Sequence, residues 1–176
     1  MKIFIGLGNP GFQYQKNRHN AGHMFIDFLK QVNQAPNYSS SASAKAEYVW
    51  ITIKGEKCEL LKSLSFMNTS GTVVKQVLKK HPEITTSQLY IVHDDLDIPF
   101  GKFKIQFGTG PKLHNGVRSI EDELGTNEFW RIRIGVDARS PENWTDGETY
   151  SLQDFTDEEH HQLQSLFENV YKQLTQ

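Results

Sequence analysis

The sequence predicts a single α/β domain, a sandwich in which helices flank a mixed, largely parallel twisted sheet. Three observations lead to this prediction. Short apolar segments rich in β-branched residues alternate with segments whose apolar residues recur at helical spacing. The 176 residues suit one domain, and 37% apolar with 11% aromatic residues supply a core. Since we find no internal repeat and no break in composition, we expect residues 1–176 to form one domain.

The first part of the chain predicts a strand, a loop and a helix. Residues 2–7 form a short apolar segment that ends at the turn Gly8-Asn9-Pro10-Gly11, which is typical of a buried strand. After a polar loop, apolar side chains recur at one-face spacing from about Gly22, which predicts a helix. The Ser- and Ala-rich residues 37–46 indicate a flexible connection.

The middle of the chain predicts three further strands and a helix. Residues 48–53 and 58–62 are strand segments separated by a glycine-containing turn, as in a hairpin. A second helix carries the apolar positions of residues 73–78 on one face. Residues 89–92 predict a buried strand that ends at His93-Asp94-Asp95.

The last part of the chain predicts two strands and two helices. Residues 102–107 alternate between polar and apolar side chains, as a half-buried strand does. A helix follows from about Asn115, and residues 131–136 form another strand. Thr156 and Glu159 have the spacing of a capping box, which predicts that the final amphipathic helix begins there.

Charge and composition narrow the class of protein. Residues 1–136 hold 17 Lys and Arg against 12 Asp and Glu, whereas residues 137–176 hold 2 against 9. The larger part can therefore present a basic surface to nucleic acid, although an acidic tail that only aids solubility explains the charge as well. No apolar run exceeds four residues, and Cys58 is the single cysteine. We expect a cytoplasmic protein without a membrane partner, a disulfide framework or a cysteine-rich zinc site.

Gly6-Leu7-Gly8-Asn9-Pro10-Gly11 matches the G-x-G-x-x-G pattern of dinucleotide-binding proteins, but its context argues against that function. The pattern requires a helix that opens at the third glycine, whereas a polar loop follows here. Pro10 lacks an amide hydrogen and favours an extended Asn9, which presents the Asn9 side chain instead of backbone donors.

Five polar residues are expected to meet at one edge of the sheet. Asn9, Asn68 and Asp94 each follow a predicted strand, and ligand crevices of open α/β sheets lie at the carboxyl ends of the strands. Asn115, at the start of a helix, can reach the same edge. His19 lies in the polar stretch before the first helix, where an exposed or capping histidine is the alternative.

These residue types form a chemically coherent set. A histidine with a pKa near 6.5 can take a proton from water at neutral pH, and a carboxylate fixes its tautomer and stabilises the imidazolium. An Asn carboxamide can bind a peptide amide or donate to a developing oxyanion. No serine lies in a nucleophile elbow, and Cys58 lies in a predicted strand without a base nearby, so water is the expected nucleophile.

A metal site is the weaker interpretation of the same region. His93-Asp94-Asp95-Leu96-Asp97 offers oxygen and imidazole ligands, but its spacing matches no EF-hand or zincin pattern. His160-His161 lies at the start of the last helix and is expected to be solvated.

The chain resembles the bacterial-type peptidyl-tRNA hydrolases over nearly its whole length. Several separate motifs in the family's order carry the resemblance, which makes it far more specific than any one of them. They are Ile5-Gly6-Leu7-Gly8-Asn9-Pro10-Gly11, Tyr14, Arg18-His19-Asn20, Phe66-Met67-Asn68, Ser70-Gly71, His93-Asp94, Leu96-Asp97, Pro99, His114-Asn115-Gly116 and Arg133-Ile134-Gly135. The resemblance implies an enzyme that cleaves the ester between a peptide and the 3′ ribose of a tRNA, which frees the tRNA for reuse in translation.

The resemblance also implies roles for residues. The catalytic set would be His19 as the base that activates water, Asp94 as its orienting partner, and Asn9, which distinguishes blocked from free aminoacyl ends. The residues that bind the substrate would be Tyr14, Phe66, Asn68 and Asn115, and Arg133 would contact phosphate of the tRNA acceptor stem. The family uses no metal or organic cofactor and is usually monomeric, so no obligatory protein partner is expected.

Two departures from the family pattern bear on how the substrate is held. Residues 108–113, Gly-Thr-Gly-Pro-Lys-Leu, replace the family's usual glycine-rich run, and Gln106 stands where a basic residue is common. Lys102, Lys104 and Lys112 are then the candidate phosphate contacts. Two alternatives remain open here, a non-catalytic RNA-binding module on the same fold and a hydrolase of small acyl esters that does not bind RNA.

Overall fold

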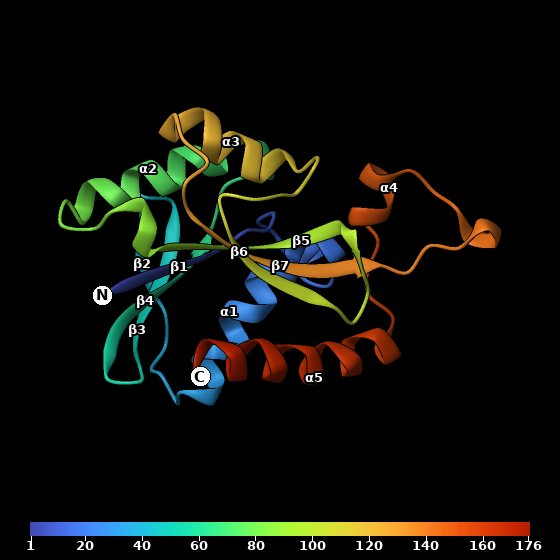
Figure 1. Ribbon diagram of the computed structural model, residues 1–176, viewed down its shortest axis with the longest axis horizontal. Helices are drawn as coiled ribbons and strands as arrows, with labels where there is room; N and C mark the ends of the chain where they lie inside the picture. Colours follow the sequence, from blue (N-terminus) through green and yellow to red (C-terminus); the bar gives the residue numbers. More distant parts are fainter.

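A seven-stranded mixed sheet forms the centre of the computed structural model, which describes residues 1–176 (Figure 1). The strand order is β2-β3-β4-β1-β5-β7-β6. The four central strands are parallel, and β2, β3 and β6 run antiparallel to their neighbours at the edges. The strands are β1 (Lys2–Gly6), β2 (Ser39–Ser41), β3 (Ala46–Ile53), β4 (Glu56–Ser63), β5 (Leu89–Pro99), β6 (Phe103–Phe107) and β7 (Trp130–Asp137).

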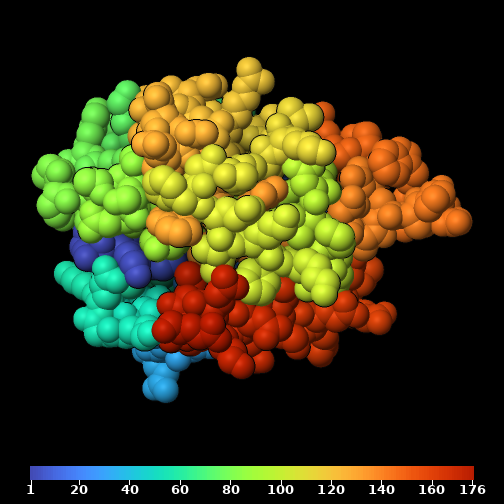
Figure 2. Space-filling model, viewed as in Figure 1, coloured from blue at the N-terminus to red at the C-terminus, as the bar shows by residue number.

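Helices cover both faces of this sheet. Helices α2 and α3 lie over one face, and α1 and α5 lie over the other (Figure 1). The short helix α4 belongs to a segment that projects from the body of the molecule (Figure 2). The helices are α1 (Ala21–Val32), α2 (Ser70–Lys80), α3 (Asn115–Leu124), α4 (Gly147–Ser151) and α5 (Asp157–Leu174).

Two hydrophobic cores result from the alternation of side chains along buried strands. In β1, Ile3 and Ile5 pack with α2 and α3, whereas Phe4 packs with α1 and α5. All three side chains are at most 2% exposed. Burial of each such side chain stabilises the fold by roughly 1.5–3 kcal/mol, so both faces of the sheet hold the layers together.

The predicted fold class is confirmed, and most predicted elements are present. The capping box is also present, because the Thr156 hydroxyl accepts a hydrogen bond from the Glu159 amide and the Glu159 carboxylate accepts one from the Thr156 amide. None of the helices has the length and apolar character that a bilayer crossing requires.

Three elements differ from the prediction. Strand β5 does not end before His93 but continues to Pro99, because β7 keeps pairing with it as far as Asp95 and again at Pro99. Part of the expected flexible connection forms β2, whose backbone pairs with β3 although its residues are all serine. Helix α4 was not predicted, because its five residues are too short to show a helical period.

Candidate active site

The candidate site lies where the parallel strands end. Asn9 follows β1, and Asn68 follows β4. Asp94 lies within β5, but β1 pairs with β5 only as far as Val92, so Asp94 extends past the end of its neighbour. This offset opens one side of β5 at the rim of the sheet, which is where ligand crevices form in open α/β folds.

His19 is held against Asp94 by a turn before α1. It lies in the 3₁₀ turn Arg18–Asn20, and its Nδ1 is 2.8 Å from Asp94 Oδ1. An ionised carboxylate can only accept, so Nδ1 carries the proton and the lone pair lies on Nε2. Nε2 has no protein partner and is not among the fully buried atoms. The His19 side chain is 14% exposed, so Nε2 is free to meet a water molecule from the crevice.

The pair has shifted pKa values that suit proton transfer. Burial works to lower the pKa of His19, but the charge of Asp94 and the hydrogen bond to it outweigh burial and raise the pKa above 6.5. Burial works to raise the pKa of Asp94, yet the neighbouring imidazoles of His19 and His114 hold it well below its ordinary value. Asp94 therefore stays ionised at neutral pH and stabilises the imidazolium that forms when His19 takes a proton.

His114 is a second partner of Asp94 that the sequence analysis did not assign. Its Nε2 lies 2.9 Å from the same oxygen, Asp94 Oδ1. Its Nδ1 accepts hydrogen bonds from the amides of Gly116 and Val117, so His114 is the N-cap of α3. Since Nδ1 must keep its lone pair for these amides, the proton lies on Nε2 and is directed at Asp94. The signal in the sequence was a polar side chain just before a predicted helix.

His93 completes the imidazole cluster from inside the sheet. Its side chain is fully buried, and 4.8 Å separates its ring centroid from that of His114. Its Nδ1 donates to the Asp94 carbonyl oxygen at 2.6 Å. Burial, followed by the nearby His114, lowers the pKa of His93 well below 6.5. Among the three histidines around Asp94, His19 alone combines a free nitrogen with access to solvent.

His19, Asp94 and His114 also lie close enough to form a metal cluster, because one ligand atom from each lies within 4.8 Å of the others. The hydrogen bonds argue against such a cluster. Nδ1 of His114 caps α3, so its Nε2 carries a proton and has no lone pair for a metal ion. The three side chains of His19, Asp94 and His114 therefore form a hydrogen-bonded cluster and do not form a metal site.

The Asn9 side chain is oriented by hydrogen bonds on both its backbone and its oxygen. Asn20 accepts from the Asn9 amide at 2.9 Å and donates to the Asn9 carbonyl at 3.0 Å. Asn9 Oδ1 accepts from the Met67 amide at 3.0 Å. The Met67 amide takes one lone pair of Oδ1, whereas the Nδ2 hydrogens of Asn9 have no protein partner, so Asn9 presents mainly donors to a ligand.

The predicted substrate-binding residues lie on three segments, namely the turn Phe12–Tyr14, the turn Met67–Thr69 with Phe66 before it, and the start of α3. Gly116 of α3 lies against Met67, where a Cβ would overlap the Met67 sulfur, and this close approach brings the start of α3 to the turn that holds Asn68. Asn68 and Asn115 are both exposed, and their carboxamides make no protein hydrogen bond. Phe66 is 55% exposed and meets Tyr14 edge-to-face, with 6.5 Å between the ring centroids.

The two predicted phosphate contacts have different environments. Lys104 is exposed on β6 without an acidic partner. Arg133, its neighbour on β7, is only 6% exposed and pairs with Asp95 at 2.7 Å and with Gln106 at 2.7 Å. Gly110 packs against its guanidinium, so Arg133 supports the loop of residues 108–113 from below. Arg133 is therefore less accessible than Lys104, and its contact with tRNA phosphate stays a prediction.

Arg18, the neighbour of His19, was also missed as a structural anchor. Its guanidinium makes two hydrogen bonds to Glu159, at 2.8 and 2.7 Å, and donates to the Asp154 carbonyl. It also lies 4.4 Å from the Tyr150 ring centroid. Arg18 thus ties the turn that holds His19 to α4 and α5, more than 130 residues later in the chain.

Comparison with known proteins identifies the family of this chain. A model of the family described as peptidyl-tRNA hydrolase matches residues 3–176. The chain belongs to the peptidyl-tRNA hydrolase family. The peptidyl-tRNA hydrolase of Frankia alni is 38% identical over 167 residues, which cover 95% of this chain and 82% of that protein. That of Geobacter metallireducens is 46% identical over 136 residues, which cover 77% of this chain and 68% of that protein.

A solved structure of the same family has the same fold. The crystal structure of peptidyl-tRNA hydrolase from Acinetobacter baumannii superposes with a TM-score of 0.86 at 27% identity, over 99% of this chain and 86% of that one. The resemblance inferred from the motifs is therefore confirmed at the level of family and fold. The roles of individual residues in this family member stay predictions.

Proposed function

We propose that the protein hydrolyses the ester between a peptide, or an N-blocked amino acid, and the 3′ ribose of tRNA. The observation that carries this proposal is the 2.8 Å contact between His19 Nδ1 and Asp94 Oδ1, which leaves Nε2 as an unprotonated base facing the crevice. Membership of the peptidyl-tRNA hydrolase family supports the choice of substrate.

The proposed reaction is a direct attack by water. His19 Nε2 takes a proton from a water molecule as its oxygen bonds to the acyl carbon, and the carbonyl electrons move to the oxygen. The bond to the ribose oxygen then breaks, and the imidazolium returns the proton to that oxygen. The products are a carboxylic acid and a free tRNA 3′ hydroxyl. A positioned base contributes about 10²–10⁴ in rate, which suits an ester because it is already a reactive acyl donor.

Asn9 supports discrimination between blocked and free aminoacyl ends. The Met67 amide takes one lone pair of its Oδ1 and both Nδ2 hydrogens are unpaired, so Asn9 offers mainly N–H donors to the substrate. A blocked end brings a carbonyl oxygen that can accept these donors, whereas a free end brings an ammonium group that can only donate. Leaving the Asn9 donors unpaired costs about 1–3 kcal/mol, roughly 5-fold to 150-fold in rate.

The other residues that we assign to substrate binding are side chains that are accessible to solvent. Asn68 and Asn115 carry uncommitted carboxamides that can hold the peptide and the developing oxyanion, and Tyr14 and Phe66 offer an aromatic surface beside them. Lys104 is the residue we assign to the tRNA backbone, with the exposed Lys102 just before the same strand.

Two properties complete the proposal. We propose that the protein works in the cytoplasm, where its substrate is produced, and that it acts as a monomer without a metal, an organic cofactor or an obligatory protein partner. Light scattering of the pure protein should give a mass near 20.2 kDa, and a mass near twice that value would contradict the monomer.

A paired assay tests the function. The wild-type protein should release the acyl group of N-acetylaminoacyl-tRNA and leave free aminoacyl-tRNA intact. His19→Ala should slow the release by about 10²–10⁴ because the base is lost, while tRNA binding in a filter assay stays near the wild-type value.

The rival interpretations predict other results. Turnover by His19→Ala near the wild-type rate would contradict the assignment of the base. Binding of tRNA without any hydrolysis by the wild type would favour the RNA-binding module, against which the intact His19–Asp94 pair argues. Hydrolysis of small esters without tRNA binding would favour the second alternative.

A further inference from the structure

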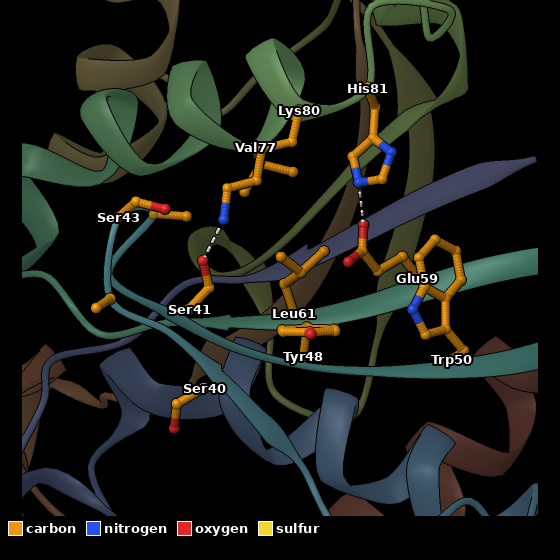
Figure 3. Close-up of a pocket in the computed structure, with 12 residues that line it drawn as sticks. Ser40, Ser41, Ser43, Tyr48, Trp50, Glu59, Leu61, Val77, Lys80 and His81 are labelled. Atoms are coloured by element: carbon orange, nitrogen blue, oxygen red, sulfur yellow. Dashed lines mark hydrogen bonds and ion pairs between the residues drawn. The ribbon is translucent and has the colours of Figure 1, made fainter.

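A cavity of about 630 Å³ lies between the end of α2 and strands β2, β3 and β4, apart from the His19–Asp94 pair (Figure 3). Its polar side chains contact one another. Glu59 lies 2.8 Å from His81 Nε2, and Lys80 reaches across the opening to the Ser41 hydroxyl (Figure 3). Since these groups already have partners within the protein, we assign no ligand to this cavity.

The glycines of the pattern Gly6-Leu7-Gly8-Asn9-Pro10-Gly11 have structural reasons that involve no nucleotide. Gly11 has a φ of 113°, which residues with a side chain rarely adopt. A Cβ at Gly6 would lie 2.5 Å from the Gly22 carbonyl oxygen and 2.7 Å from the Ile26 side chain. These two glycines therefore permit a turn and the close packing of β1 against α1.

Gly8 is required for a contact with a side chain of α1. Its φ is not positive, so alanine could adopt the same backbone conformation. Space excludes a side chain instead, because a Cβ at Gly8 would lie 2.8 Å from both Cγ and Nδ1 of His23. Carbon atoms in good contact are about 3.5–4.0 Å apart. The His23 imidazole therefore lies directly on the Gly8 backbone.

The start of α1 cannot easily move to relieve this contact. One residue before His23, a Cβ on Gly22 would overlap the Val92 carbonyl and lie 2.6 Å from the Leu7 amide nitrogen. The helix is thus already packed as closely as its backbone allows. The His23 atoms nearest to Gly8 include Cγ, the atom that joins the ring to the side chain, so only a different rotamer would remove the ring.

His23 is an uncharged packing group. Burial, followed by the charge of Lys62, lowers the pKa of His23 to about 4, although Asp27 and the Ser63 backbone act in the opposite direction. Its Nε2 is fully buried and has no hydrogen-bond partner. A neutral imidazole with this nitrogen buried is suited to fill space and does not act as a second base.

The residue bonded to Gly8 is Asn9, which presents donors to the substrate. Asn20 fixes the Asn9 backbone through hydrogen bonds of 2.9 and 3.0 Å, and the Met67 amide fixes Asn9 Oδ1 at 3.0 Å. We propose that His23 is a positioning residue for Asn9, because its ring holds the Gly8–Asn9 peptide where the Nδ2 hydrogens meet the acyl end of the substrate. This inference rests on the proposed function and adds to it a residue that affects specificity without touching the substrate.

Gly8→Ala tests the contact. The new methyl group and the ring must part by about 0.6 Å to lengthen 2.8 Å to an ordinary contact of 3.4 Å. A misplacement of about 1 Å costs about 100-fold in rate, so kcat/KM for N-acetylaminoacyl-tRNA should fall about 10-fold. The ratio of this value to that for free aminoacyl-tRNA should fall by a similar factor, because a free end gains nothing from the Asn9 donors.

A second substitution tests the partner. His23→Ala in the Gly8→Ala protein should recover most of the lost ratio, because the shorter side chain leaves room for the methyl group. His23→Ala alone should lower the ratio several-fold, because one side of Gly8 is left open. A double variant no more selective than Gly8→Ala would overturn the proposal, as would a wild-type ratio in His23→Ala. The latter result decides the question even if thermal unfolding shows that Gly8→Ala is not folded.

Met24→Ala is the matched control. Met24 follows His23 on α1 and packs against the core on the α5 side of the sheet. Its truncation should lower Tm but leave the ratio at the wild-type value. A loss of ratio equal to that of His23→Ala would show that any loosening of α1 has the same effect, which would overturn the specific role of His23.

Thermal unfolding separates this inference from the proposed hydrolysis. Gly8→Ala should lower Tm more in the wild type than in the His23→Ala protein, whether or not the protein is active. A wild type that releases no acyl group would overturn the proposed function, and the role of His23 in specificity with it. An active wild type with additive Tm shifts and unchanged ratios would overturn this inference alone.

Discussion

At the scale of the residue, the arrangement around Asp94 decides which group acts as the base. One carboxylate oxygen accepts from His19 and His114 together. His114 is committed to the N-terminus of α3, and His93 is buried. The single carboxylate therefore fixes two imidazoles but leaves only His19 free to exchange a proton with the crevice.

Asp94→Asn should change the pH profile as well as the rate. The Asn oxygen can still accept from His19, so the tautomer is kept, but the charge that raises the pKa of His19 is lost. The base works only when neutral, so the wild type loses activity as pH falls through its raised pKa. The variant should lose activity at a lower pH, with a rate about 10-fold lower because the imidazolium is less stabilised.

The profile of kcat/KM between pH 5 and 9 measures this effect. Asp122→Asn is the control, because it neutralises a carboxylate on α3 whose side chain is 75% exposed, whereas that of Asp94 is buried. An Asp94→Asn profile that coincides with the wild type would remove Asp94 from the mechanism.

At the scale of the element, the turn that holds His19 depends on the C-terminal helices. Arg18 is 5% exposed and forms a two-bonded pair with Glu159, which itself belongs to the capping box of α5. Glu159 therefore connects the N-terminal cap of α5 to the turn that holds His19. A loss of this pair should loosen both elements.

Arg18→Lys should lower stability although it keeps the charge. The guanidinium donates to Glu159 from Nη2 and to the Asp154 carbonyl from Nη1, and a single ammonium nitrogen cannot reproduce this pair of donors or the contact with the Tyr150 ring. We expect a loss of about 1–3 kcal/mol in the free energy of unfolding, measured in urea, and Arg18→Met should lose more. In a double-mutant cycle, Arg18→Met and Glu159→Gln should be less than additive, whereas full additivity would contradict the coupling.

At the scale of the whole molecule, charge is distributed unevenly along the chain. The excess of acidic residues lies in residues 137–176, which form the projecting segment and α5 (Figure 2). Lys104 lies on the edge strand β6 and Lys102 directly precedes this strand, away from α2. The net charge of −2 therefore does not exclude a local surface for tRNA.

The salt dependence of KM tests this surface. Each phosphate contact adds about one unit to the slope of log affinity against log salt, so Lys104→Gln should reduce the slope by about one. Lys172→Gln, exposed near the end of α5, should leave the slope at its wild-type value. Equal slopes for wild type and Lys104→Gln would show that Lys104 does not contact the backbone.

Local patterns in the sequence predicted the elements and several members of the site. The polar residues at strand ends indicated Asn9 and Asp94, and the histidine before α1 indicated His19. The extent of β5 was predicted wrongly, because a strand's length depends on how far its neighbour pairs with it. The roles of His114 and Arg18 were missed because their partners lie 20 and about 140 residues away.

The sequence by itself determined the fold class, the family and the set of groups able to carry proton transfer, since these depend on composition and on short-range spacing. Only the tertiary structure decided which imidazole is free, which direction the Asn9 amide faces and why Arg133 is withdrawn from the surface. It also brought Glu59 and His81 together in a separate cavity. Tautomers, burial and ion pairing are set by contacts between distant segments, and no local pattern contains them.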